Sequence, residues 1–257
     1  MNTHTLRVDL NSDMGEGFGQ YTLGNDDALL DIVTSANVAC GFHAGDPEIM
    51  ATTFRTAKEK GVAVGAHPGY PDLWGFGRRR LPFSTGEIER FVAYQIGAAQ
   101  ALASQAGHKL TYVKIHGALA NVADVEPEIA RAIIRAIVAV DPNLICLAIA
   151  LGEQIKAAEA AGLRVASEIY ADRAYTDEGR LVPRSQPHAL IHDPVLAAER
   201  VASMVVSGRI ITHSGKEIPV PNSSVCVHGD GPDAPAIALG IRKRLEEAGV
   251  TIAPFSN

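Results

Sequence analysis

A chain of 257 residues, 47% hydrophobic and 20% charged, has the composition of a globular protein and is long enough to bury a substantial core. Its 23 Lys and Arg residues and 29 Asp and Glu residues leave a net charge of −6, which argues against a nucleic-acid-binding surface because such surfaces are basic. No run approaches the roughly 20 apolar residues that span a bilayer, and the N-terminal residues lack the basic and apolar regions of a signal peptide. We therefore expect a cytoplasmic protein that binds neither nucleic acid nor a membrane.

Seven short apolar segments predict buried strands, because most of them lack an alternation of polar and apolar residues. They span residues 6–10, 36–40, 62–66, 112–116, 144–150, 163–169 and 224–228. Capping signals predict helix starts between the strands, at Asp46-Pro47, Ser84, Asp193-Pro194 and about Asp233. A small hairpin is expected over residues 210–220.

The alternation of strands and helices predicts an α/β fold with a parallel sheet, in a single domain over residues 1–257. No low-complexity linker or shift in composition marks a domain boundary. Polar residues follow most strands instead of clustering at one point. This favours a distorted barrel over an open, doubly wound sheet, because the loops after barrel strands converge on one site.

The first predicted strand runs into the polar sequence VDLNSDMGEGFG, residues 8–19. Asp9, Asn11 and Asp13 alternate along it and would project to one side if the strand extends that far. Glu16 follows among glycines. The segment could be a polar turn, or the mouth of an active site whose carboxylates bind a metal or move a proton.

Four of the nine histidines lie at or just beyond the ends of predicted strands: His43, His67, His116 and His228. A lone histidine in such a place is most often structural, but four in equivalent places, with acids beside several of them, favour a shared pocket. Imidazole is both a metal ligand and a proton carrier near neutral pH. The glycines on either side of His43 would let the backbone approach a ligand closely.

Basic side chains follow two of the strands. Lys114 lies between two apolar residues of a predicted strand, and a buried lysine requires a charged partner or a function. Arg78, Arg79 and Arg80 form a run of a kind that is usually solvated, although the planar guanidinium also suits a carboxylate substrate.

Three cysteines, Cys40, Cys146 and Cys226, lie far apart in apolar segments, which predicts buried, reduced thiols. Disulfides are rare in the cytoplasm, so this prediction agrees with the expected location. The spacing fits neither a zinc site nor a disulfide framework.

A polar segment of residues 167–191 follows the sixth strand and contains Glu168, Asp172, Arg173 and Arg184. It is too long for a simple connection. Segments of this length are often lids or binding loops.

A glycine-rich turn after the last strand carries His228 and Asp230. It could hold an anion at the start of the following helix, or it could be an ordinary loop. The chain has no GxxxxGK[ST] P-loop, no GxGxxG dinucleotide turn, no GxSxG elbow and no HExxH pair. It should therefore not bind ATP through a P-loop or use a serine nucleophile on an elbow.

Six ordered segments together resemble the LamB/YcsF family of 5-oxoprolinase A subunits. They cover nearly the whole chain and read DLNSDMGEGFG, ANVACGFHAGDP, GAHPGYPD with GFGRR, VKIHGALAN, EIYADRAYTDEGRLVPR and CVHGDGP. The resemblance implies a fold similar to the irregular seven-stranded barrel of the glycoside hydrolase/deacetylase superfamily. It also implies an enzyme that opens the lactam ring of 5-oxo-L-proline to L-glutamate, converts ATP to ADP and phosphate, and works with two further subunits, B and C.

The ATP requirement has a chemical reason. A five-membered lactam is a poor electrophile, and phosphorylation of its amide oxygen would create a leaving group and make attack by water feasible. The missing P-loop is compatible with nucleotide chemistry that depends on the partner subunits.

From this resemblance we expect Asp13 to act as general base for the attacking water, with His43 and His67 orienting it or joining it as ligands of a divalent metal. Lys114 and one arginine of residues 78–80 would neutralise the substrate carboxylate or a developing oxyanion. The expected catalytic residues are Asp13, His43, His67, Lys114 and His116. The expected substrate-binding residues are Asn11, Glu16, Asn37, Arg78, Arg79, Glu168, Arg173 and His228.

Two other functions stay open at this point. The chain could be a stand-alone metal-dependent hydrolase, such as a deacetylase of small N-acetyl sugars or another hydrolase of small amides. Asp13, His43 and His67 with a bound water would then form its metal site. Alternatively, it could be a non-catalytic component that only presents the substrate to its partners.

Overall fold

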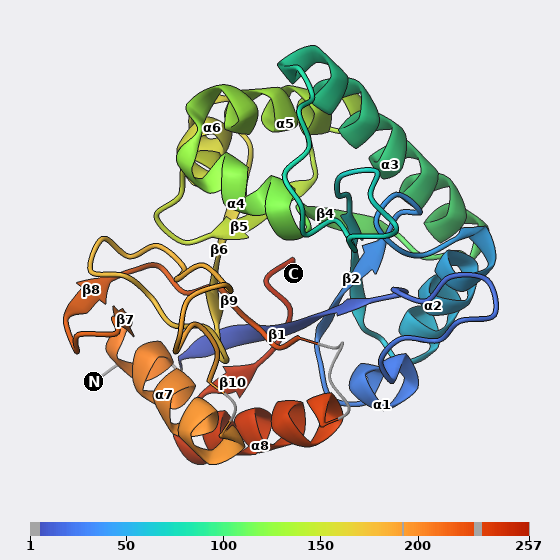
Figure 1. Cartoon of the computed structure of the whole chain (residues 1–257). Helices are drawn as coiled ribbons and strands as arrows, with labels where there is room; N and C mark the ends of the chain where they lie inside the picture. Colours follow the sequence, from blue (N-terminus) through green and yellow to red (C-terminus); the bar gives the residue numbers. More distant parts are fainter. Residues whose placement is uncertain (1–5, 192, 229–232, 257) are drawn as a thin grey trace.

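Seven parallel strands close into a barrel in the computed structural model, which describes residues 6–191, 193–228 and 233–256 (Figure 1). The strands are β1 (Arg7–Met14), β2 (Ser35–Ala39), β3 (Ala63–His67), β4 (Leu110–Lys114), β5 (Ile145–Ile149), β6 (Val165–Tyr170) and β9 (Ser224–Cys226). Each pairs with the next in this order, and β9 pairs with both β6 and β1. The predictions of seven strands and of a closed barrel are confirmed.

Helices cover the outside of the barrel (Figure 1). They are α1 (Asp26–Leu30), α2 (Pro47–Glu59), α3 (Thr85–Gln105), α4 (Gly117–Val125), α5 (Pro127–Val140), α6 (Glu153–Ala160), α7 (Pro194–Ser207) and α8 (Ala234–Glu247). The Asp46 side chain accepts hydrogen bonds from two backbone amides of α2, and Ser84 with Glu87 forms a complete capping box on α3. The capping signals therefore located these helices correctly.

Two elements differ from the sequence-based expectation in a way that matters for function. β1 continues to Met14, well beyond the predicted end at residue 10. β4 stops at Lys114, so His116 is the N-cap residue of α4, a helix that the sequence did not predict. Gly117, with a φ of +55°, makes the sharp turn between strand and helix that a larger side chain would disfavour.

The described residues between β6 and α7 contain no helix, and their strand-like contacts are single bridges between Arg173 and Leu190 and between Tyr175 and Leu181. This segment connects β6 to α7 and lines the cavity described below. The predicted hairpin of β7 (Arg209–Ile211) and β8 (Glu217–Pro219) packs against it, because Thr212 and Ser214 of the hairpin donate hydrogen bonds to Asp177. An ion pair fastens the segment to the barrel, because Nη1 of Arg180 lies 2.9 Å from Oδ1 of Asp124 on α4.

Aromatic side chains fill the opposite end of the barrel, where β10 (Thr251–Ile252) pairs with the start of β1. The Phe255 ring packs edge-on against Tyr112, with ring centroids 5.0 Å apart. The described residues after β10 accordingly lie inside the ring of strands in Figure 1. Gly65 faces the Tyr112 ring so closely that a Cβ atom would lie 2.3 Å from it. Only the carboxyl end of the barrel is left for a polar site.

No helix among the described residues is long and apolar enough to cross a membrane.

Candidate active site

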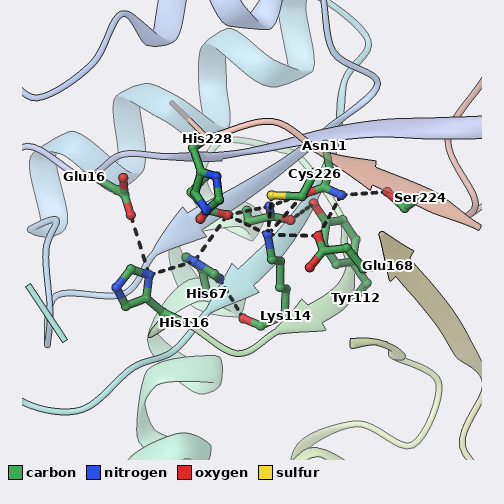
Figure 2. A network of polar contacts seen from close by, with 12 residues as sticks. Asn11, Glu16, His67, Tyr112, Lys114, His116, Glu168, Ser224, Cys226 and His228 are labelled. Atoms are coloured by element: carbon green, nitrogen blue, oxygen red, sulfur yellow. Dashed lines mark hydrogen bonds and ion pairs between the residues drawn. The ribbon is translucent and has the colours of Figure 1, made fainter. Parts of the chain in front are cut away.

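Strand β1 directs three polar side chains into the barrel. Because it persists to Met14, Asp9, Asn11 and Asp13 all face inward, as their spacing predicted. The Asn11 amide donates to Oε1 of Glu168 at 2.9 Å and to Oγ of Ser224 at 2.7 Å, while its oxygen accepts from Asn37 at 2.7 Å. Asn11 and Asn37 therefore belong to a buried network beneath the cavity described below. Figure 2 shows Asn11 beside Glu168 and Ser224.

Lys114 is the buried cation of this network, with 3% of its surface exposed. Its Nζ lies 2.9 Å from Oδ1 of Asp13, 3.0 Å from Oε1 of Glu168 and 3.2 Å from Sγ of Cys226. Burial alone would lower the pKa of Lys114, but Asp13 and the other anionic neighbours outweigh it and hold that pKa well above its usual range. The lysine is therefore charged, and the expectation that it requires a charged partner is confirmed.

Asp13 lies where this network meets the cavity. Its Oδ1 accepts hydrogen bonds from Lys114 and from Nδ2 of Asn37 at 2.8 Å, and it is 3.3 Å from Nε2 of His67. Burial raises the pKa of Asp13, but the charges of His67 and Lys114 together hold it well below its usual range. Asp13 is therefore an ionised acceptor throughout the physiological pH range.

The His67 and His116 rings have their tautomers fixed by backbone carbonyls. Nδ1 of His67 lies 2.8 Å from the carbonyl of Lys114, and Nε2 of His116 lies 2.8 Å from the carbonyl of Phe76. A carbonyl only accepts, so these two nitrogens carry hydrogens. The remaining nitrogens face each other at 3.1 Å (Figure 2). Oδ1 of Asp13 also faces Nε2 of His67. Three acceptor atoms therefore meet around Nε2 of His67, and a proton or a metal cation between them is required to offset their repulsion.

The His43 ring stacks on His116 with centroids 3.7 Å apart. It is buried, neither ring nitrogen has a hydrogen-bond partner, and Nε2 lies 3.6 Å from Oε1 of Glu16. Burial, together with His116 and His67, lowers the pKa of His43 well below its usual value, so the ring is neutral. Glycines make room for the pair: a Cβ atom on Gly77 would lie 2.7 Å from Cβ of His43.

Glu16, His43, His67 and His116 each offer a ligand atom, and these atoms all lie within 4.8 Å of one another. His67 and His116 each hold one ring nitrogen against a carbonyl, and with the neutral His43 ring and the Glu16 carboxylate they form a donor set suited to Zn²⁺ and similar divalent ions. The cluster could therefore hold a metal. Its composition differs from the expected set, since Glu16 and His116 join His43 and His67, while Asp13 is engaged by Lys114.

An open cavity of about 480 Å³ lies above the network. Six of the expected residues on its wall have basic or imidazole side chains, namely Arg78, Lys114, Arg173, His67, His116 and His228. The polar wall also includes Arg180, Arg184, Tyr170, Asn121 and Ser185, and the acidic lining residues of the described chain are Asp13 and Asp124. Glu168 lines a smaller pocket beneath, beside Lys114.

His228 links the last strand to the loop after β6. Its Nδ1 lies 2.7 Å from Asp172, its Nε2 lies 2.9 Å from Nη2 of Arg184, and its ring stacks on Tyr170 with centroids 5.8 Å apart. The Asp172 carboxylate can only accept, so Nδ1 carries a hydrogen and Nε2 accepts from Arg184. Asp230, which the sequence placed beside His228, lies outside the described residues.

Some expected contacts are absent from the cavity. Arg79 turns away and pairs with Asp72, and Arg80 pairs with Glu126 on the surface. Of the two glycines beside His43, Gly45 serves the protein's own packing, because a Cβ atom on it would lie 2.8 Å from a backbone oxygen.

Several members of the site were not singled out from the sequence. They are Tyr170, Tyr112, Ser224 and Arg180. Strand alternation could have found Tyr112, two residues before Lys114, and Tyr170, two residues after Glu168. Cys226 and the other two cysteines are free and buried as predicted, but the contact of Cys226 with Lys114 was not expected.

A sequence profile described as the LamB/YcsF family matches residues 8–257. The chain belongs to the LamB/YcsF family. Among its relatives, the A subunit of 5-oxoprolinase from Azorhizobium caulinodans is 63% identical, covering 97% of this chain and 98% of that protein. The protein of the same name from Gluconobacter oxydans is 57% identical, covering 95% and 96%.

Solved structures agree with the fold of this LamB/YcsF chain. The lactam utilization protein of Thermus thermophilus superimposes with a TM-score of 0.91 at 44% identity, covering 96% of this chain and 99% of that one. A T48 deacetylase superimposes with a TM-score of 0.52 at 14% identity, over 98% and 89% of the two chains. The second likeness concerns the fold alone, and it confirms the expected similarity to deacetylase barrels.

Proposed function

We propose that this chain is the A subunit of an ATP-hydrolysing 5-oxoprolinase, which opens 5-oxo-L-proline to L-glutamate with ATP hydrolysis to ADP and phosphate. The observation that carries the proposal is the 63% identity to a protein of that name over nearly the full length of both chains. Such a protein requires further subunits, and we take these to be B and C, on which the use of ATP depends.

The cavity has the chemistry for such a substrate. A volume of about 480 Å³ lies within the range of small-molecule sites. 5-Oxoproline combines a carboxylate with a lactam, and the basic wall that contains Arg78 and Arg173 favours the anion. Lys114 is a poorer carboxylate ligand than expected, because its charge is shared between Asp13 and Glu168.

Asp13 remains our candidate for the residue that receives a proton from the attacking water. It is ionised and adjoins the cavity, and Lys114, His67 and Asn37 hold it in place. Its low pKa makes it a weak base, so its contribution depends on orientation more than on basicity.

We also propose that the histidine cluster binds a metal ion. Glu16, His43, His67 and His116 are the residues that would hold a divalent ion. When bound, such an ion supplies a Lewis acid beside the cavity. His67 lies between this cluster and Asp13, and so it couples the metal ligands to the proposed base.

The same cluster is the observation that favours the second candidate, a stand-alone metal-dependent hydrolase of small amides or N-acetyl groups. Reconstitution separates the candidates. The chain should produce glutamate from 5-oxo-L-proline only together with subunits B and C and ATP. Metal-dependent amide hydrolysis by the chain alone would support the second candidate. If subunits B and C converted 5-oxo-L-proline to glutamate at the full rate without this chain, the chain would have no role in the reaction.

A further inference from the structure

Two arginines of the loop after β6 face the cavity together. Arg173 is 4% exposed, and one of its terminal nitrogens donates to the carbonyl of Val182 at 2.7 Å. Its Nε is buried without a hydrogen-bond partner. Arg184 lies at the rim, and both residues line the same cavity. Burial and then the charge of Arg184 lower the pKa of Arg173, and nearby Asp172 offsets this only in part, so the two guanidiniums destabilise each other.

The acids that could neutralise these arginines have other partners. Asp172 accepts a hydrogen bond from His228, and Asp124 pairs with Arg180. Asp13 pairs with Lys114 deeper in the barrel. Among the described residues, this side of the cavity therefore carries more positive than negative charge, even though Asp172 interacts with both arginines. A buried donor, Nε of Arg173, remains to be satisfied by a ligand.

Arg184 is held in its position by a chain of contacts. Its Nη2 donates to His228, which donates in turn to Asp172 and stacks on Tyr170. In Figure 2, His228 lies apart from the pair of His116 and Glu16. His228 is thus a positioning residue, and the guanidiniums supply the charge for an anion.

We propose that Arg173 and Arg184 form a phosphate subsite, which holds the phosphoryl group of an ATP-activated lactam. This inference rests on the proposed function. One planar guanidinium satisfies a carboxylate, whereas two guanidiniums on the wall of the same cavity match a tetrahedral dianion with several oxygens. The substrate of this chain is then the phosphorylated lactam, with its phosphoryl group toward the loop after β6 and its ring toward Asp13.

Inorganic phosphate titrated into the purified full-length chain, followed by calorimetry or ³¹P NMR, tests the subsite. Arg184→Gln should raise the Kd for phosphate at least about tenfold, as expected for loss of one charge-assisted hydrogen bond. Arg55→Gln, an exposed arginine on α2, is the matched control and should change it less than about twofold. Arg173→Lys should also weaken phosphate binding, in a protein whose thermal unfolding shows that it is folded.

Titration of 5-oxoproline into the same variants shows whether the arginines bind a phosphoryl group or the carboxylate of the substrate. Arg184→Gln should leave its Kd within about twofold of the wild-type value. An equal loss of affinity for phosphate and for 5-oxoproline would assign the arginines to the substrate carboxylate and overturn the phosphate subsite. An unchanged Kd for phosphate in Arg184→Gln would also overturn it, and so would the absence of saturable phosphate binding to the wild-type chain. If phosphate binding depends on Arg184 while the complex does not turn over 5-oxoproline, the proposed function fails and the subsite stands.

Discussion

Nζ of Lys114 lies 2.9 Å from Oδ1 of Asp13, in a part of the barrel where neither charge is well solvated. The lysine also neutralises Glu168 at 3.0 Å. One cation on β4 thus supports two carboxylates that come from two other strands of the barrel, β1 and β6. This arrangement keeps Asp13 ionised at the edge of the cavity.

Lys114→Met should therefore be strongly destabilising. It leaves Asp13 and Glu168 buried without their cation, and loss of one partner of a buried ion pair costs about 3–5 kcal/mol. Urea unfolding of wild type and variant measures this change. Lys156→Met, which breaks the exposed pair with Glu153, is the control and should cost no more than about 1 kcal/mol. Equal effects of the two substitutions would show that the buried pair has no special importance.

Asp9 should make stability fall as pH rises. Burial raises the pKa of Asp9 to about 6 from an ordinary 3.8, although Ser224, Ser35 and Thr34 donate hydrogen bonds to it. The folded state thus holds this proton where the unfolded state has lost it. The stabilisation is complete below about pH 4 and is lost as pH rises through about 6, an effect of about 3 kcal/mol at most.

Asp9→Asn cannot ionise, so its free energy of unfolding should rise relative to wild type between pH 4 and 7. Denaturant titrations at several pH values measure the difference, from which groups common to both proteins cancel. Asp46→Asn should show the opposite sign below about pH 4, because the backbone amides of Gly19 and of the first turn of α2 together outweigh burial and lower the pKa of Asp46. If the free energies of unfolding of wild type and Asp9→Asn differed by the same amount at every pH, the pKa of Asp9 would not be raised in the folded state.

The histidine cluster should bind a divalent ion. Addition of Co²⁺ to metal-free protein should give the visible absorption of a low-symmetry site with nitrogen ligands. His116→Ala should weaken binding at least about tenfold, since even loss of an outer contact costs that much at metal sites. His213→Ala, an exposed histidine on the hairpin, should leave binding unchanged. If His116→Ala bound Co²⁺ as tightly as the wild type does, the histidine cluster would not be the metal site.

Gly77→Ala should disturb the histidine pair. Gly77 has a φ of +61°, and an added Cβ would lie 2.7 Å from Cβ of His43 and 2.9 Å from Cδ2 of His116. Gly162→Ala is the matched control, because its φ of +73° imposes a similar backbone cost with nothing within 4 Å. Both should lose about 1–2 kcal/mol of stability from the backbone, and Gly77→Ala should lose more. Equal losses measured by thermal unfolding would show that the histidines move aside freely.

The strands and the inward side of β1 could be predicted from the sequence because they follow from local patterns. Apolar runs identified all seven barrel strands, and alternation placed Asp9, Asn11 and Asp13 together. The strand-end histidines converge because parallel strands end at one edge of a barrel, which needs only the fold class. Asp46 was likewise recognised as a helix cap from its own neighbours.

The parts that could not be predicted depend on partners far away in sequence. Arg79 and Arg78 are adjacent, yet Arg79 pairs with Asp72 while Arg78 lines the cavity. The replacement of Asp13 by His116 and Glu16 in the candidate metal cluster follows from the position of Lys114, which only the packed barrel fixes. The Tyr112 and Phe255 contact joins a central strand to the C-terminal segment, and no local pattern indicates it.

Glutamate formation from 5-oxo-L-proline by the complex of this chain with subunits B and C and ATP tests the central claim most directly, when wild type is compared with Asp13→Asn. The account predicts that Asp13→Asn lowers the turnover number at least about 100-fold, the contribution of a positioned acid or base, in a chain that still assembles with its partners. Asp31→Asn, a carboxylate whose side chain is 68% exposed, serves as the control and should keep full activity. Near-normal turnover by the Asp13→Asn complex would contradict the account.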